Sequence, residues 1–191
     1  DMDADGVNDY VWCRQESRNN VVTIWLMNAD RTLKSEQIVS PVLSTAYTLA
    51  GAGDMNSDGK ADLLWHRNSS GSLIVWHMNG AGTMQSISVL VASMSGYRLR
   101  LVADMNQDGN ADLIWQRVGS KTETSIWYMN GAGVRTSLRV LGSLAKNWQL
   151  GCAGDYNGDG LMDVIWYDTT NKKAVGWELD AQNAMTDWST I

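Results

Sequence analysis

The sequence predicts an all-β protein, a β-propeller built of four repeats of about 50 residues with fifteen strands in all. Three observations predict this fold. A glycine-containing acidic segment recurs four times, two tryptophans follow each copy at nearly constant spacing, and short apolar runs alternate with turns rich in Gly, Asn and Ser. We therefore expect one propeller region over residues 1–191, with repeats at about 1–44, 45–95, 96–146 and 147–191.

The acidic segments define the repeat. Each follows the pattern Asp-x-Asp/Asn-x-Asp-Gly-x-x-Asp, and the four copies begin at Asp1, Asp54, Asp104 and Asp155. One Trp stands three residues after each copy and another follows about a dozen residues later. These eight tryptophans are Trp12, Trp25, Trp65, Trp76, Trp115, Trp127, Trp166 and Trp177. Their regular spacing favours a structural role in the gaps between blades, with sugar stacking as the alternative.

The second repeat illustrates the expected strands. Apolar runs at 62–67, 73–78 and 84–90 are separated by polar turns, and a run at 97–102 leads into the next acidic segment. Asn79-Gly80 predicts a tight hairpin turn between two of them. The first repeat begins on its acidic segment and so lacks a leading strand, which is why we expect fifteen strands. The repeats would form a small ring, part of a larger ring, or one subunit of a multi-chain ring.

Composition excludes several classes of protein. The formal net charge of −6 argues against a nucleic-acid binder, which would be expected to show a basic patch. Hydrophobic residues make up 44% of the chain, enough for a packed core, so disorder is not expected. No apolar stretch is long enough for a transmembrane helix. We therefore expect neither a nucleic-acid partner nor a membrane span.

The acidic segments have the ligand chemistry of Ca²⁺ sites. Positions 1, 3, 5 and 9 offer side-chain oxygens, position 7 can offer a backbone carbonyl, and Gly at position 6 permits a sharp turn. We expect up to four Ca²⁺ ions as cofactors. Their candidate ligands are Asp1, Asp3, Asp5, Val7 and Asp9; Asp54, Asn56, Asp58, Lys60 and Asp62; Asp104, Asn106, Asp108, Asn110 and Asp112; and Asp155, Asn157, Asp159, Leu161 and Asp163.

Zinc, magnesium and the EF-hand fit these segments less well. Zinc prefers His and Cys, and magnesium usually keeps several waters. An EF-hand needs a bidentate Glu at position 12 and flanking helices, whereas position 12 is Trp in every copy and the flanks resemble strands. An Asp/Asn/Gly turn without a metal is the remaining alternative, although clustering so many carboxylates without a cation would be costly.

The loops followed by Leu-Leu-Trp or Leu-Ile-Trp resemble the FG-GAP/VCBS repeats of integrin-like β-propellers over essentially the whole chain. Two features depart from that pattern. The usual Phe at loop position 2 is replaced by Met or Tyr, and Ala103 replaces a Gly before the third loop. The resemblance implies mainly structural Ca²⁺ ions. It also implies an extracellular ligand-binding protein, similar to integrin ectodomains, propeller lectins or ancillary domains of secreted hydrolases and lyases.

Ligand-contacting residues are harder to find. Trp148 and Trp188 break the repeat and are candidates for exposed sugar-stacking platforms, and Arg67 and Arg117 are weaker candidates for contacts with sugar hydroxyls. Positions that differ between repeats are expected to face solvent, as are both histidines. One set of these positions is Cys13, His66, Gln116 and Tyr167, and another is Leu26, His77, Tyr128 and Glu178.

The two cysteines bear on ring closure. Cys13 and Cys152 could form a disulfide if the first and fourth repeats are neighbours in a four-blade ring, but they would be too far apart in an arc of a larger ring. Both alternatives stay open at this point.

The acidic loops predict a calcium-stabilised propeller, and the family resemblance implies a secreted binding module with a glycan or glycoprotein as partner. No nucleophile motif or phosphate-binding loop is found, so we expect no catalytic residues. Two alternatives are a propeller domain of a secreted polysaccharide lyase or hydrolase, and a structural, assembly or adhesion protein. A homo-oligomer or continuation into a longer chain also remains open.

Overall fold

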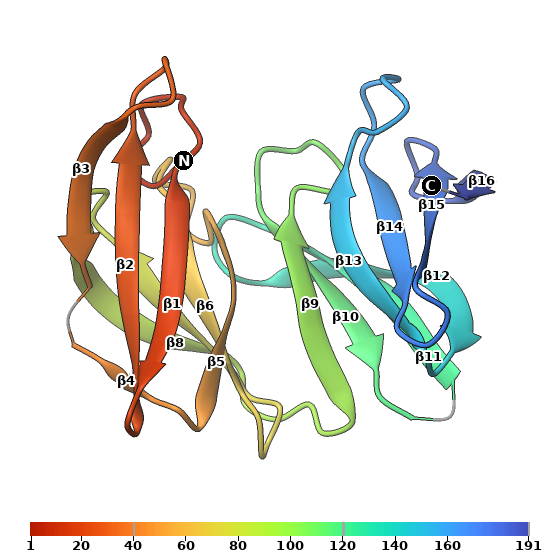
Figure 1. Cartoon of the computed structure of the whole chain (residues 1–191), viewed down its shortest axis with the longest axis horizontal. Coiled ribbons are helices and arrows are strands. Elements are labelled where there is room, and N and C mark those ends of the chain that lie inside the picture. The colour runs from red at the N-terminus through yellow and green to blue at the C-terminus, as the bar shows by residue number, and fades with distance from the viewer. Residues whose placement is uncertain (40, 120, 191) are drawn as a thin grey trace. The chain divides into compact units, whose positions relative to one another are not determined.

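A computed structural model describes residues 1–39, 41–119 and 121–190, so positions 40, 120 and 191 lie outside the description. Within these ranges the chain forms sixteen strands and no helix (Figure 1). The strands are β1 (Tyr10–Glu16), β2 (Asn19–Met27), β3 (Leu33–Ile38), β4 (Leu43–Ser44), β5 (Tyr47–Gly53), β6 (Asp62–Arg67), β7 (Leu73–Met78), β8 (Met84–Val91), β9 (Tyr97–Ala103), β10 (Asp112–Arg117), β11 (Lys121–Met129), β12 (Arg135–Ala145), β13 (Trp148–Gly154), β14 (Asp163–Asp168), β15 (Lys173–Leu179) and β16 (Met185–Thr190).

These strands form four antiparallel sheets, each made of four strands consecutive in the chain, and we call them the first to fourth blades. β1–β4 form the first blade, β5–β8 the second, β9–β12 the third and β13–β16 the fourth. The chain divides into two compact units, residues 1–95 and 96–191, and each unit contains two blades. The predicted all-β propeller repeat is confirmed.

The strand count differs from the prediction by one. In the first blade, the strand that corresponds to β8 of the second blade is interrupted and counts twice, as β3 and β4. Both pieces pair with β2, β3 with its second half and β4 with Asn19 and Asn20. Pro41 lies between the two pieces and has no N–H to donate to the ladder. In the third blade the equivalent strand, β12, runs without a break.

The predicted hairpin turn at Asn79-Gly80 is present, as a loop of five residues between β7 and β8. The N–H of Asn79 donates to the carbonyl of Thr83, and the Asn79 side-chain oxygen accepts the N–H groups of Ala81 and Thr83. The short side chain therefore closes the loop by replacing a backbone acceptor. Asn130 closes the corresponding loop of the third blade in the same way, and Asp180 that of the fourth.

The core of each unit lies between its two blades. In the first unit Val22 and Ile24 of β2 pack against Trp65 and Trp76 of the second blade. In the second unit Ile126 and its neighbours pack against Trp166 and Trp177. In both units, one blade presents its tryptophan face to the aliphatic face of the blade before it. Alternation of side chains along each strand produces these two faces.

The repeat tryptophans form one pair in each blade. Trp65 and Trp76 lie diagonally across neighbouring strands with ring centroids 5.1 Å apart, and the other three pairs lie at 5.0–5.3 Å. Trp65, Trp76, Trp115 and Trp166 are at most 1% exposed, in agreement with the predicted structural role. The first blade is the exception, because Trp12 is 51% exposed.

The prediction that variable positions face solvent is only partly right. Cys13 and Tyr167 are exposed, but His66, Gln116 and Leu26 are buried. Gln116 is buried because its side chain is used twice, accepting from Arg100 Nε at 2.8 Å and donating to the Trp148 carbonyl at 3.1 Å. His66 lies on the same strand face as the fully buried Leu64.

Candidate metal loops and an aromatic platform

The four acidic loops occupy the same place in each blade. They span residues 1–9, 54–62, 104–112 and 155–163, and each leads into the strand that carries the first tryptophan of its pair, namely β1, β6, β10 or β14. The position-9 aspartates of the last three loops are also the first residues of those strands. The loops are therefore anchored at one end by sheet hydrogen bonds.

Each loop winds around the carboxylate at position 1. In the first loop Asp1 Oδ1 accepts the N–H of Asp5 at 3.2 Å and Asp1 Oδ2 accepts the N–H of Gly6 at 2.8 Å. The same two bonds recur in the other loops, at 3.1–3.3 Å and 2.8–2.9 Å. The position-6 glycines have φ between 83° and 86°, a conformation that disfavours side chains, which explains the Gly in every copy.

The carboxylate at position 9 joins its loop to the sheet. Asp112 is fully buried; its Oδ2 accepts the N–H of Met105 at 3.0 Å and its Oδ1 accepts the N–H of Met129, at the end of β11, at 2.9 Å. The same clamp recurs in the other three loops, where the strand residues are Met27, Met78 and Leu179. Sequence reasoning assigned these aspartates as metal ligands and missed this second, structural role.

Burial of these carboxylates has an electrostatic cost. Burial raises the pKa of Asp112 to about 6, and the neighbouring carboxylates of Asp108 and Asp104 add to the rise against the hydrogen bonds that oppose it. Burial also raises the pKa of Asp62. A cation bound in the loop would favour the ionised carboxylates and so reverse this effect.

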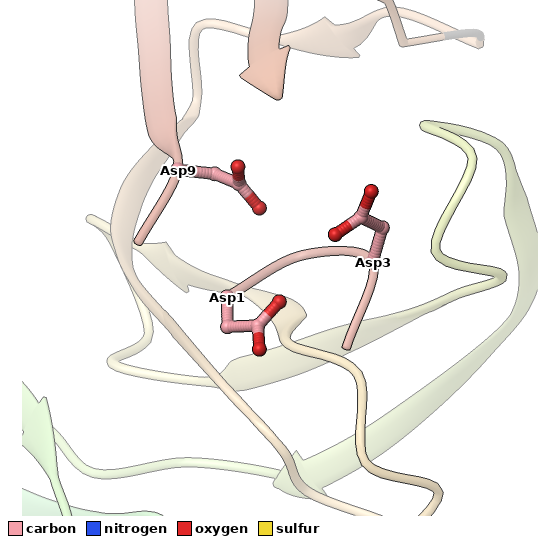
Figure 2. A group of neighbouring side chains, drawn as sticks. All are labelled: Asp1, Asp3 and Asp9. Atoms are coloured by element: carbon pink, nitrogen blue, oxygen red, sulfur yellow. The ribbon is translucent and has the colours of Figure 1, made fainter. Parts of the chain in front are cut away.

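The carboxylates of the first loop converge. One oxygen from each of Asp1, Asp3 and Asp9 lies within 4.8 Å of the others, and the three side chains face a common space (Figure 2). Within the described residues Asp3 Oδ1 is also buried without a hydrogen-bond partner. An orphaned carboxylate oxygen beside two further carboxylates fits an oxygen-ligated cation such as Ca²⁺.

Positions 5 and 7 complete the loops. The position-7 N–H donates to the carboxylate at position 5 in all four copies, at 2.8–3.0 Å. The position-7 residues Val7, Lys60, Asn110 and Leu161 thus all use their backbone N–H, and Asn110 adds a side-chain bond from its Nδ2 to Asp108 Oδ1 at 2.9 Å. Every loop offers carboxylate and backbone carbonyl oxygens, and the last three add the amide oxygen of an Asn at position 3, which are the ligands that a hard cation prefers.

The first blade also exposes an aromatic platform, which we define as Tyr10, Trp12 and Trp25. Tyr10 is 55% exposed and stacks on Trp12 with ring centroids 6.1 Å apart, and Trp12 meets Trp25 edge-on at 5.3 Å. A shallow hollow of about 210 Å³ lies over the two tryptophans, and Arg14 and Glu36 line it. A larger hollow of about 410 Å³ lies between Tyr10 and the first acidic loop.

The weaker ligand candidates are dispersed. Trp148 and Arg117 line one hollow of about 120 Å³ in the second unit. Trp188 is 60% exposed on β16, outside that hollow, and Arg67 lies over the ring of Tyr47 at 5.8 Å. The platform residue Trp12 had been assigned a structural role by its spacing, and only its exposure distinguishes it from the other repeat tryptophans.

The remaining groups that sequence analysis singled out are His77 and the two cysteines. His77 was expected to be exposed, but it is partly buried, with Nδ1 2.9 Å from Asp62 Oδ2 and Nε2 2.9 Å from Ser88 Oγ. Cys13 and Cys152 are free, exposed thiols, one in each unit. No helix in the described part of the chain is long and apolar enough to cross a membrane.

The loops and strands described above recur as one unit, and a family model detects the same unit. The model of the FG-GAP-like repeat matches residues 1–65, 54–115 and 104–166. The chain belongs to the FG-GAP-like repeat family. Each matched segment runs from one acidic loop to the first tryptophan after the next loop, so the family pattern includes the acidic loops and the repeat tryptophans that helped to predict the fold.

A solved structure is similar in fold to this chain. It is a lectin of Agrocybe aegerita, and the structure is described as showing how that lectin specifically recognises non-reducing terminal N-acetylglucosamine. The two chains are 17% identical with a TM-score of 0.54, and the match covers 90% of this chain and 48% of the lectin. The chain thus spans about half the length of that lectin. A search of curated protein sequences found no match.

Proposed function

We propose that this FG-GAP-like propeller is a secreted, calcium-stabilised module that binds carbohydrate. The observation that carries the proposal is the first blade, which combines an oxygen-lined loop with an exposed aromatic platform beside it. The lectin neighbour supports the choice of a carbohydrate ligand at the level of the fold alone. Loops as exposed as these would bind Ca²⁺ weakly. Such affinity suits a secreted protein, since extracellular modules bind Ca²⁺ with dissociation constants of about 10⁻⁴–10⁻³ M.

The calcium part of the proposal rests on the loops. Side-chain oxygens at positions 1, 3, 5 and 9 and the carbonyl at position 7 would hold one ion in each loop. The ion supplies positive charge that offsets the clustered carboxylates. The chain's own residues then hold the loop to the sheet, because the position-9 carboxylate bonds both the loop and the neighbouring strand.

The carbohydrate part rests on the platform. Aromatic faces pack on the apolar faces of sugar rings, and Trp12 and Tyr10 expose such faces side by side. Arg14 and Glu36 at the edge of the hollow can donate to and accept from sugar hydroxyls. A site of this kind is apolar at its centre with a few polar groups at its rim, as small-ligand sites generally are.

Two measurements test the proposal. Thermal melts in Ca²⁺ and in excess EDTA should differ by several degrees, since a ligand that binds only the folded state stabilises it. A glycan array, followed by titration with N-acetylglucosamine-terminated glycans, should detect binding that Trp12→Ala abolishes and Trp188→Ala retains. An identical melt in EDTA would overturn the calcium assignment, and loss of binding in Trp188→Ala alone would overturn the platform.

One observation favours a second candidate function, assembly with another propeller blade. Trp65 and Trp76 occupy the same positions in the second blade as the platform tryptophans and are buried against a neighbouring aliphatic face. The platform could bury its tryptophans in the same way. Sedimentation of the wild type and of Trp12→Arg would separate the two functions: a dimer that the substitution dissociates, with no glycan bound, favours assembly.

A further inference from the structure

The first acidic loop differs from the other three at position 3. The other loops have Asn56, Asn106 or Asn157 there, and the amide Nδ2 donates to the position-5 carboxylate at 3.3, 3.0 and 3.1 Å. The first loop has Asp3, which when ionised has no proton to donate. Its two neighbouring carboxylates, Asp3 and Asp5, therefore need a donor from elsewhere.

Lys34 supplies that donor. Its ammonium lies 2.8 Å from Asp3 Oδ2 and 2.6 Å from Asp5 Oδ2, and it comes from β3, 29 residues beyond Asp5. Hydrogen bonding to Lys34 lowers the pKa of Asp5, and bonding to Asp3 and then Asp5 raises the pKa of Lys34. The register of the sheets places Gln85, Thr136 and Thr186 at the equivalent position of the other blades, and none of these is charged.

The extra carboxylate and the extra ammonium therefore occur together, in one loop. We infer that Lys34 is a built-in cation of the first loop, which holds Asp3 and Asp5 together without metal and makes this loop bind Ca²⁺ more weakly than the other three. This inference rests on the calcium binding proposed above.

The position of Lys34 decides whether the first loop binds Ca²⁺ more weakly or more strongly than the others. An additional carboxylate by itself would strengthen the attraction for Ca²⁺. The Lys34 ammonium, however, bonds to both Asp3 and Asp5, which are candidate metal ligands, so an entering ion must break two charge-assisted hydrogen bonds. The Lys34 side chain is 41% exposed, so it has room to move into solvent at high Ca²⁺ concentration.

The amide signals of the position-6 glycines can follow the loops separately by ¹H–¹⁵N NMR during a Ca²⁺ titration of the metal-free chain. Gly59, Gly109 and Gly160 should saturate first, and Gly6 at a concentration about tenfold higher or more. Lys34→Met should bring Gly6 into the range of the others. Gln85→Met, the matched substitution in the second blade, should leave Gly59 unchanged.

A transplant tests the same device by gain of function. Asn56→Asp combined with Gln85→Lys should give the second loop the weaker binding of the first. If Gly6 of the wild type saturates with or before the other glycines, the inference is wrong although calcium binding stands. If none of the four glycines responds to millimolar Ca²⁺, the calcium proposal fails and this inference fails with it. The wild-type comparison needs no substitution, so it holds even if a variant does not fold.

Discussion

Replacing Asp112 with Ala tests whether the position-9 carboxylate joins the loop to the sheet. Asp112 has no exposed surface, and its two oxygens accept the N–H groups of Met105 and Met129 at 3.0 and 2.9 Å. The substitution leaves both N–H groups without this acceptor in a buried site. The loop and the end of β11 then lose the side chain that connects them.

The magnitude follows from two opposing contributions. Each buried N–H left without an acceptor costs about 1–3 kcal/mol, or about 4 kcal/mol for the pair. Removal of the buried carboxylate charge offsets part of this loss of stability. The rise of the Asp112 pKa from 3.8 to about 6 corresponds at neutral pH to about 3 kcal/mol, which we reduce to about 2 because water screens the open side of the loop. The net loss in EDTA is therefore about 2 kcal/mol.

Calorimetric or circular-dichroism melts at pH 7 in EDTA measure this loss. A change of about 2 kcal/mol should lower the melting temperature by about 4–8 °C in a chain of this size. Asp187→Ala, at an exposed position of β16, is the control and should change the stability by less than about 0.5 kcal/mol. Equal melting temperatures for the two variants would refute the clamp.

Three further outcomes follow from the same structure. Because the pKa of Asp112 is raised, the folded state keeps a proton between pH 3.8 and about 6 that the unfolded chain has lost. The stabilisation from protonated Asp112 is therefore complete below pH 3.8 and disappears as the pH rises through about 6. Melts of metal-free protein should thus shift upward from pH 7 to pH 5, less so in Asp112→Ala, and a flat profile contradicts this. Trp76→Ala should cost about 3–5 kcal/mol and the half-exposed Trp12→Ala under about 1.5, as measured by denaturant unfolding. Gly71→Ala should destabilise the protein more than Gly96→Ala in the same assay. Both glycines have positive φ, but of the two only Gly71 would place its new Cβ against a backbone carbonyl oxygen, at 2.3 Å. Equal losses of stability would show that the backbone shifts freely at Gly71.

Local chemistry made much of the fold and the loops predictable. The position-1 carboxylate bonds N–H groups four and five residues away, and the position-6 glycine is required by its own φ, so both features are visible in a nine-residue pattern. Hairpin-connected strands keep the repeat in order along the chain. The spacing of the tryptophans predicted their structural role, and the structure adds that they pair within each blade, because neighbouring strands bring together residues about a dozen positions apart.

The residues that sequence reasoning missed are those whose partners come from other strands. The position-9 clamp reaches a strand 16–18 residues away, and Lys34 reaches back 29 residues to Asp5. Gln116 was expected in solvent but is buried. Its sequence position could not show this, because the Trp148 carbonyl that accepts its Nε2–H belongs to the next blade.

The sequence by itself determined the repeat, the oxygen-rich loops and the blade as the repeating element, since each depends on contacts within one short stretch or between strands that follow one another in the chain. Tertiary structure alone decided which copy of each element is exceptional. Trp12 and Trp65 occupy equivalent positions, yet one is half exposed and the other fully buried. The reason is physical: burial depends on the neighbouring surface, and identical repeat positions meet different neighbours.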